Sequence, residues 1–480
     1  MNKRMIVYML GRLVSFEGVL LLLPALIAVI YKENTFLPYI CCAAALIILG
    51  LLMSLVKIKD KTIFSKEGLV TVALGWVVLS IGGAVPFYLT KEIPSFVDAF
   101  FEAVSGFTTT GSSILTDVEA LSKSSIFWRS FTHWIGGMGV IVFVIATMKM
   151  ASGGGNIYLL RSESPGPEVS KLVPSSKGTA KILYIIYLVM TVAEVIALLL
   201  CGLPVFDSLT LSFGTAGTGG FGINNSFVAA NNPAAQTVIA IFMVAFGINF
   251  SCYYLLLVKK FKDFFKNEEL RVYLSLLLGA VLVIAVNITK MYGSFSEALH
   301  HSFFQVSSVM TTTGYSTTDF NAWPELSRMI MVILMFIGAS AGSTGGGIKV
   351  IRIMIFAKAG LREIQLATKP NKVSPIRCDG KTISETMVRS VCSYFAIYML
   401  VFVISLLLIS FENKDIVSNT TSVIATLNNI GPGLEKVGAT GNFSSYSSFS
   451  KLVFSANMLL GRLELLPLFV LFSPKTWKRR

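Results

Sequence analysis

The stretch VMTTTGYSTTDF, Val309–Phe320, places threonines, a glycine and a tyrosine between two long apolar segments. The sequence around it resembles three other parts of the chain. The four stretches read FEAVSGFTTTG (Phe101–Gly111), LTLSFGTAGTG (Leu209–Gly219), FQVSSVMTTTG (Phe304–Gly314) and TSVIATLNNIG (Thr421–Gly431). A motif that recurs four times predicts one structural unit used four times.

The composition is typical of a protein embedded in a membrane. Of the 480 residues, 54% are hydrophobic and 14% are charged, whereas a soluble domain carries about 25% charged residues. A helix of about 20 apolar residues crosses a bilayer. Ten segments meet this description and predict spans at residues 9–31, 36–56, 68–90, 126–148, 181–203, 235–258, 271–291, 328–355, 388–411 and 449–472.

The net charge of +14 comes mainly from lysines and arginines in alternate connectors between these spans. The basic connectors are residues 1–4, 57–66, 149–181, 259–271, 352–389 and 475–480. The positive-inside rule places them, and therefore both termini, in the cytoplasm. The basic charge does not indicate nucleic-acid binding, because it is not gathered on one face of a soluble domain.

The four repeated stretches begin with segments that are too short to span a bilayer, and we expect these segments to be re-entrant helices. They cover residues 96–109, 205–216, 294–311 and 416–427. The predicted unit is a span, a re-entrant pore helix, a polar strip and a second span. Four such units are expected at residues 68–150, 178–260, 271–360 and 385–475, preceded by two extra helices in residues 1–67. The predicted fold is an all-α polytopic membrane protein with four pseudo-repeated units around a central pore.

The polar strips are the candidate site. Irregular backbone at membrane depth persists only where it is buried in protein or lines a watery cavity. A ring of backbone carbonyls can replace the hydration shell of a cation, and glycine allows the positive φ angles that aim successive carbonyls inward. The predicted filter residues are Thr109, Thr110, Gly111, Gly217, Thr218, Gly219, Thr312, Thr313, Gly314, Asn429, Ile430 and Gly431. The alternative is that the strips are ordinary Gly/Thr turns between helices.

A second motif, GASAGSTGGGIK (Gly338–Lys349), interrupts the apolar run 328–355. So many glycines break a helix, and a broken helix in a pore protein lines a cavity. We expect a flexible loop below the filter that obstructs the pore. Its predicted gate residues are Gly338, Gly342, Ser343, Thr344, Gly345, Gly346 and Gly347. The alternative is close helix packing through small residues.

Arg462 lies inside the last predicted span, where a charge is costly and usually functional. Glu464 lies two residues on, so it faces elsewhere on a helix and is a poor partner. We expect Arg462 to act with the glycine loop as an electrostatic barrier to cations. A salt bridge to another helix is the alternative.

Four acidic residues lie near the outer ends of the strips: Asp117, Glu119, Asp319 and Glu435. They would either concentrate cations at the entrance of the pore or simply be solvated residues at the ends of loops.

Six motifs together resemble those of the TrkH family of the Trk/Ktr/HKT potassium transporter superfamily. They are TTTGSS (Thr108–Ser113), AGTGGFG (Ala216–Gly222), TTTGYST (Thr311–Thr317), GASAGSTGGGIK (Gly338–Lys349), NNIGPGL (Asn428–Leu434) and GRLELLPL (Gly461–Leu468). The resemblance covers essentially the whole chain. It implies potassium uptake across the bacterial cytoplasmic membrane through a channel-like pore gated by the glycine-rich loop.

The same resemblance implies a homodimer and a separate cytosolic, TrkA-like regulatory subunit with nucleotide-binding domains. Residues 149–181 and 352–389 are the largest candidate docking segments. K⁺ would be the transported ion, with no organic cofactor in this chain. In the wider family a serine in place of the first filter glycine accompanies sodium permeation, and here all four aligned positions are glycine: Gly111, Gly219, Gly314 and Gly431.

A stoichiometric secondary transporter, coupled to H⁺ or Na⁺, is the alternative function. Such transporters also contain broken helices, but usually with inverted repeats. Here every repeat begins from the same side of the membrane, which favours a pore. An enzyme is not expected, because the sequence offers no pairing of a nucleophile with a base.

Overall fold

The computed structural model describes residues 1–58, 64–139, 176–371 and 374–477. Its N-terminal part is a pair of spans outside the repeat. Helices α1 (Lys3–Leu20) and α2 (Leu22–Ile30) together form the first, and α3 (Phe36–Ser54) forms the second. Helix α1 packs closely on α3, since a Cβ atom on Gly11 would lie 2.7 Å from the carbonyl oxygen of Gly50. Small residues allow such close approach between membrane helices.

Each of the four units opens with a long apolar helix. These helices are α4 (Ser65–Leu89), α9 (Ser176–Leu200), α14 (Glu268–Tyr292) and α18 (Glu385–Ile409). All four are long and apolar enough to cross a membrane, as are α1–α2 and α3. They confirm the spans predicted at 68–90, 181–203, 271–291 and 388–411.

Four shorter helices follow these spans, and they match the predicted re-entrant segments to within two residues at each end. The pore helices are α5 (Phe96–Phe107), α10 (Val205–Gly217), α15 (Phe295–Met310) and α19 (Ile416–Leu427). Three of them begin at a side-chain cap: Ser95, Ser294 and Asp415 each accept a hydrogen bond from the backbone N–H three residues on. Such caps satisfy the free amides of a helix start.

The second helix of each unit is short or broken. Helix α6 covers Lys123–Gly137, and the end of its predicted span 126–148 lies outside the described residues. Helices α16 (Glu325–Phe336) and α17 (Val350–Thr368) are separated by the glycine loop, as expected. The spans predicted at 235–258 and 449–472 are each made of two helices that meet at a sharp bend. Helices α11 (Pro233–Phe246) and α12 (Phe250–Leu257) meet at 91°, and α20 (Ser448–Arg462) and α21 (Leu466–Phe472) meet at 119°.

Local chemistry explains the two bends. Asn249 leaves the helical conformation, and its side chain caps the start of α12. Leu465 has a φ of +69°, and Pro467 stands in the first turn of α21, where proline starts rather than continues a helix. The described part therefore contains six helices long enough to span, or eight if each bent pair counts as one. The other two predicted spans are 126–148, which is incompletely described, and 328–355, which the glycine loop divides into α16 and α17.

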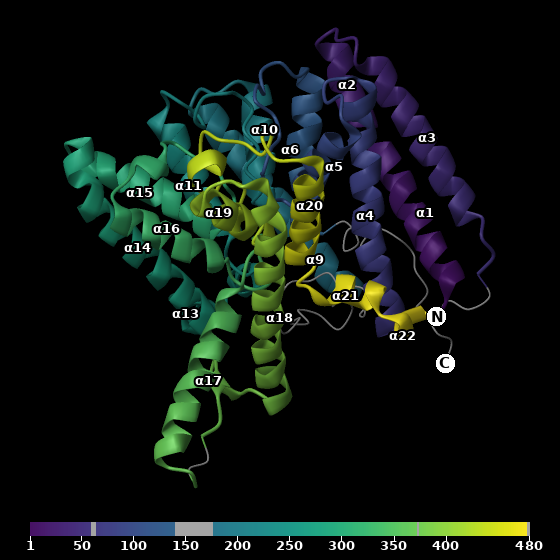
Figure 1. Ribbon diagram of the computed structural model, residues 1–480. Helices are drawn as coiled ribbons and strands as arrows, with labels where there is room; N and C mark the ends of the chain where they lie inside the picture. The colour runs from purple at the N-terminus through teal and green to yellow at the C-terminus, as the bar shows by residue number, and fades with distance from the viewer. Residues whose placement is uncertain (59–63, 140–175, 372–373, 478–480) are drawn as a thin grey trace.

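The remaining elements are short. They are α13 (Phe261–Lys266), α22 (Pro474–Trp477), the 3-10 helices η1 (Phe320–Ala322), η2 (Ser410–Glu412) and η3 (Glu435–Val437), and an antiparallel pair, β1 (Arg377–Cys378) and β2 (Lys381–Thr382). Figure 1 shows α17 and the lower end of α18 extending beyond the bundle. The start of α1, α13 and α22 lie on that same side (Figure 1). The domain boundaries expected from the sequence stay predictions.

Candidate functional site

The four polar strips share one backbone conformation directly after their pore helices. The first shared position has a left-handed φ between +55° and +59°, and it is occupied by Thr109, Thr218, Thr312 and Asn429. Two residues later a glycine also has a positive φ, between +68° and +99°. These glycines are Gly111, Gly220, Gly314 and Gly431.

The residue between these two positions donates its N–H to the carbonyl five residues before it, at 2.8 to 2.9 Å. The four bonds are Thr110 to Ser105, Gly219 to Gly214, Thr313 to Ser308 and Ile430 to Ala425. The second strip therefore stands one residue further on than the sequence alignment placed it. Gly219 is equivalent to Thr110, and Gly220 is equivalent to Gly111. The alignment of Gly217, Thr218 and Gly219 with Thr109, Thr110 and Gly111 was wrong, because two successive glycines offered two registers.

The four glycines hold the strips in a closed ring. A Cβ atom added to any of them would lie within 2.8 Å of a carbonyl oxygen of the next strip. The distances are 2.0 Å from Gly111 to Gly219, 1.8 Å from Gly220 to Thr313, 2.1 Å from Gly314 to Ile430 and 2.8 Å from Gly431 to Thr110. Each strip thus contacts the next one in chain order, and the fourth strip contacts the first. We call this arrangement the ring.

Hydroxyl and amide groups form further hydrogen bonds within and between the strips. Thr108 and Thr110 share a hydrogen bond of 2.8 Å between their hydroxyls, as do Thr311 and Thr313. The Asn429 amide donates to the Thr110 hydroxyl at 2.8 Å, which joins the fourth strip to the first. The pore helices end at the ring, so the negative ends of their dipoles lie beside it. Backbone oxygens and negative helix ends suit a dehydrated cation.

A cavity of about 370 Å³ lies on one side of the ring. Its lining includes the four glycines of the ring and the residues that follow them, among them Ser112, Phe221, Tyr315 and Pro432. The cavity therefore opens on the side toward which the strips run.

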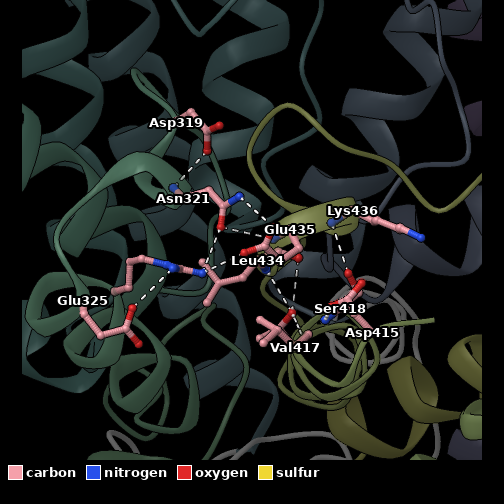
Figure 2. Close-up of polar contacts among 11 residues, drawn as sticks. Asp319, Asn321, Glu325, Asp415, Val417, Ser418, Leu434, Glu435 and Lys436 are labelled. Carbon is pink, nitrogen blue, oxygen red and sulfur yellow. Dashed lines mark hydrogen bonds and ion pairs between the residues drawn. The ribbon is translucent and has the colours of Figure 1, made fainter.

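The acidic residues at this mouth are engaged in loop contacts. Asp319 accepts a hydrogen bond from the backbone N–H of Asn321, and Glu435 forms an ion pair with Arg328 at 2.9 Å. Figure 2 shows Asn321 between Asp319 and Glu435. Asp117 accepts from the Asn225 amide at 2.7 Å, and this bond lowers the pKa of Asp117 below its usual value.

Glu119 is also bound, through the backbone N–H of Asn225 at 3.0 Å. Asp117, Glu119 and Glu435 thus contact neighbouring segments, whereas Asp319 caps its own turn. Their carboxylates fix the shape of the mouth, and attraction of cations by them stays a prediction.

The glycine loop lies on the opposite side of the ring. Gly346 donates its N–H to the hydroxyl of Thr312 at 2.6 Å. A Cβ atom on Gly346 would lie 2.7 Å from the carbonyl oxygen of Asn428. The loop is thus in direct contact with the third and fourth strips, just before they enter the ring.

Other bonds tie the loop to the broken helix of the second unit. Phe250 donates its N–H to the Gly342 carbonyl at 3.0 Å, and Ser340 donates to the Gly247 carbonyl at 3.1 Å. Gly338 donates to the Ile348 carbonyl at 2.9 Å, so the two ends of the loop meet. Among the other predicted gate residues, Ser343 and Thr344 are buried and bond to backbone carbonyls, while Gly345 and Gly347 lie against Thr311 and Thr312.

Arg462, at the end of α20, reaches both the ring and the loop. Its guanidinium donates to the Thr109 hydroxyl at 3.2 Å and to the Thr344 carbonyl at 2.9 Å. It also donates to the Gly137 carbonyl at 2.8 Å. Glu464 forms an ion pair with Arg352 instead, so the expectation that it is a poor partner for Arg462 agrees with the geometry.

Comparison with known proteins decides the family. A family model described as TrkH, cation transport protein, matches residues 39–479. The chain belongs to the TrkH family. The Trk system potassium uptake protein TrkH of Salmonella typhimurium is 36% identical over 486 residues, covering 100% of both chains. The protein of the same name in Halomonas elongata is 32% identical over 486 residues, again covering 100% of both.

A solved structure of this family agrees with the fold. The crystal structure of the potassium transporter TrkH from Vibrio parahaemolyticus superimposes with a TM-score of 0.89 at 32% identity, covering 100% of both chains. The described helices of this chain therefore share the arrangement found in that structure.

One buried residue that contacts the glycine loop, Glu269, was not predicted from the sequence. Glu269, in the first turn of α14, is 5% exposed and accepts from the N–H of Ala341 at 2.7 Å and from the N–H of Ile351 at 3.2 Å. It therefore ties both ends of the glycine loop to the third unit. An acidic residue at the start of a predicted span could have drawn attention to Glu269. Glu268 stands beside it in the same turn, so the sequence does not distinguish the two.

Proposed function

We propose that this chain is a potassium uptake protein of the bacterial cytoplasmic membrane in which K⁺ passes through the ring. The observation that carries this proposal is the closure of the ring, in which four glycines bring four strips together through backbone atoms alone. Backbone carbonyls can replace the hydration shell of K⁺. The printed names of the relatives, potassium uptake proteins and a potassium transporter, support the same ion.

The glycine loop is the gate of this pathway. Its contacts with Thr312 and Asn428 put it against the ring on the side opposite the mouth. An ion leaving the ring would meet the loop, so the loop must move for flux. Arg462 holds the loop through Thr344 and places a positive charge beside Thr109. It therefore acts as an electrostatic barrier while the loop is closed.

The protein works as a homodimer under a cytosolic, TrkA-like nucleotide-binding subunit. Support comes from the family and from the charge of the connectors, which puts both termini and α17 on the cytoplasmic side. Of the two expected docking segments, residues 352–389 form most of α17 and the β1–β2 pair. Most of the other, residues 149–181, lies outside the described residues.

Flux measurements on purified protein in liposomes test the proposal. Uptake of K⁺ and Rb⁺ should exceed that of Na⁺ and Li⁺ without any imposed proton gradient. Gly111→Ser should reduce this preference, because its side chain would meet the Gly219 carbonyl. Equal uptake of the four ions would contradict the selective ring. Uptake that requires a proton or sodium gradient would favour the coupled secondary transporter instead.

A further inference from the structure

Helix α6 carries a buried charge next to the ring that the proposed pathway does not use. Arg129 is 2% exposed and Glu102, on the pore helix α5, is 1% exposed. Arg129 Nε lies 2.8 Å and Nη2 lies 2.7 Å from Glu102 Oε1. Removing a charged group from water is energetically costly for each of the two ions. A hydrophobic pair would avoid this cost, so the ion pair calls for another explanation.

Glu102 binds the first strip beyond the ring. Its carboxylate accepts from the Ser113 hydroxyl at 2.9 Å and from the backbone N–H of Ile114 at 3.1 Å. Arg129 adds a bond of 3.3 Å from Nη2 to the Ser113 hydroxyl. The ion pair therefore fixes the segment that follows Gly111.

Arg129 also binds the second strip. Its Nη1 donates to the Gly222 carbonyl at 3.1 Å, and its Cζ lies 4.0 Å from the centre of the Phe221 ring. A guanidinium stacked on an aromatic face gains a cation–π attraction. Phe221 directly follows Gly220, so Arg129 contacts the strip next to the glycine that closes the ring.

His133, one turn along α6 from Arg129, makes a third contact with the same place. Its Nε2 accepts the backbone N–H of Phe221 at 3.3 Å. The proton of the neutral ring must then lie on Nδ1, which donates to the Gly106 carbonyl of α5 at 2.8 Å. The imidazole is fully buried and packs against the Phe221 ring, with 4.3 Å between the ring centres.

The other three pore helices carry no charge at the position of Glu102. Seven residues before the left-handed position of each strip, they have Leu211, Gln305 and Ser422. Gln305 bonds only its own strip, through the Thr318 carbonyl at 3.0 Å. Among the four pore helices, only α5 therefore carries a charge at this position.

We infer that Glu102, Arg129 and His133 form a positioning brace that holds the second strip against the first pore helix and thereby sets the ion selectivity of the ring. The inference rests on the proposed function, since it assigns these residues a role in the same filter. They are positioning residues, because their hydrogen bonds hold the backbone of the strips and of the first pore helix, and they act through the placement of that backbone.

The test is the ratio of K⁺ to Na⁺ flux, measured for each variant in one preparation of proteoliposomes. Both ions then report on the same protein, so the ratio does not depend on the amount that is folded. Arg129→Lys keeps a positive charge for Glu102 but lacks the planar fork that also reaches Gly222 and covers Phe221. We expect the ratio to fall about threefold to tenfold, as for the loss of one or two hydrogen bonds.

A second variant removes both charges, Glu102→Gln together with Arg129→Gln, so that no buried charge is left unpaired. It should lose selectivity to a similar extent. The matched control is Asp98→Asn, also on α5, which breaks an ion pair of 2.6 Å with Lys451 that contacts no strip. The control should keep the wild-type ratio.

Wild-type selectivity in both brace variants would overturn the inference. An equal loss in Asp98→Asn would also overturn it, because the effect would then be general to α5. A wild-type protein that does not prefer K⁺ would overturn the proposed function instead, so the two failures are distinguishable.

Discussion

At the scale of residues, the ring depends on backbone conformation more than on side-chain identity. Thr109, Thr218 and Thr312 have positive φ angles, which are uncommon for β-branched residues, and Asn429 takes the fourth such position. Their shared conformation makes the divergent fourth strip equivalent to the others. It also defines the register of the second strip, which side-chain identity left ambiguous between Gly219 and Gly220.

The four ring glycines should differ in their tolerance of a methyl group. The added Cβ would lie 1.8 Å from an oxygen at Gly220 but 2.8 Å at Gly431. Both substitutions strain a positive φ, but only the first demands a large shift of the neighbouring strip. Gly220→Ala should therefore lower the K⁺/Na⁺ flux ratio by about tenfold or more, an effect of about 1.4 kcal/mol. Gly431→Ala should be the mildest of the four, and a larger loss there than at Gly220 would contradict this closing contact.

At the scale of elements, the glycine loop between α16 and α17 has defined contacts rather than a loose path. It is bound to the ring at Thr312, to the bend between α11 and α12, and to Glu269 on α14. A few hydrogen bonds thus hold this segment of backbone across the proposed pathway. Because these hydrogen bonds are few, a single substitution can shift the equilibrium between the closed and open positions of the loop.

Gly346→Ala should favour the open loop. Its Cβ would lie 2.7 Å from the Asn428 carbonyl oxygen and would press the loop away from the ring. We expect a several-fold rise in basal K⁺ flux with an unchanged K⁺/Na⁺ ratio, measured in liposomes. Arg462→Ala, which removes the tie to Thr344, should act in the same direction.

The control for this prediction is Gly360→Ala in α17, where an added Cβ meets nothing within 4 Å. It should leave the flux at the wild-type level. A Gly346→Ala protein with wild-type or lower flux and normal folding would count against the loop as the gate.

At the scale of the whole molecule, the sequence predicted the repeat well and the bends poorly. The pore helices were found because short apolar segments stand out between long ones, and the four stretches share a glycine. The bends at Asn249 and Leu465 were missed because apolar composition continues through them. The brace was missed because Glu102 and Arg129 are distant in sequence and meet only when α6 packs against α5.

The orientation of the molecule gives a further prediction. Lys91 follows α4, and Lys259 follows α12; both are exposed. In a variant without the six native cysteines, a cysteine at position 91 should react with a membrane-impermeant maleimide in intact cells. A cysteine at position 259 should react only after the membrane is opened. The reverse pattern would contradict cytoplasmic termini.

The most direct measurement of the central claim is the reversal potential of the protein in a planar bilayer with KCl on one side and NaCl on the other. If the ring is selective for potassium and transport is uncoupled, the reversal potential should lie close to the equilibrium potential of K⁺. A pH difference across the bilayer should not change it. A potential near zero would contradict selectivity of the ring. A potential that follows the pH difference would contradict the pore and indicate proton coupling.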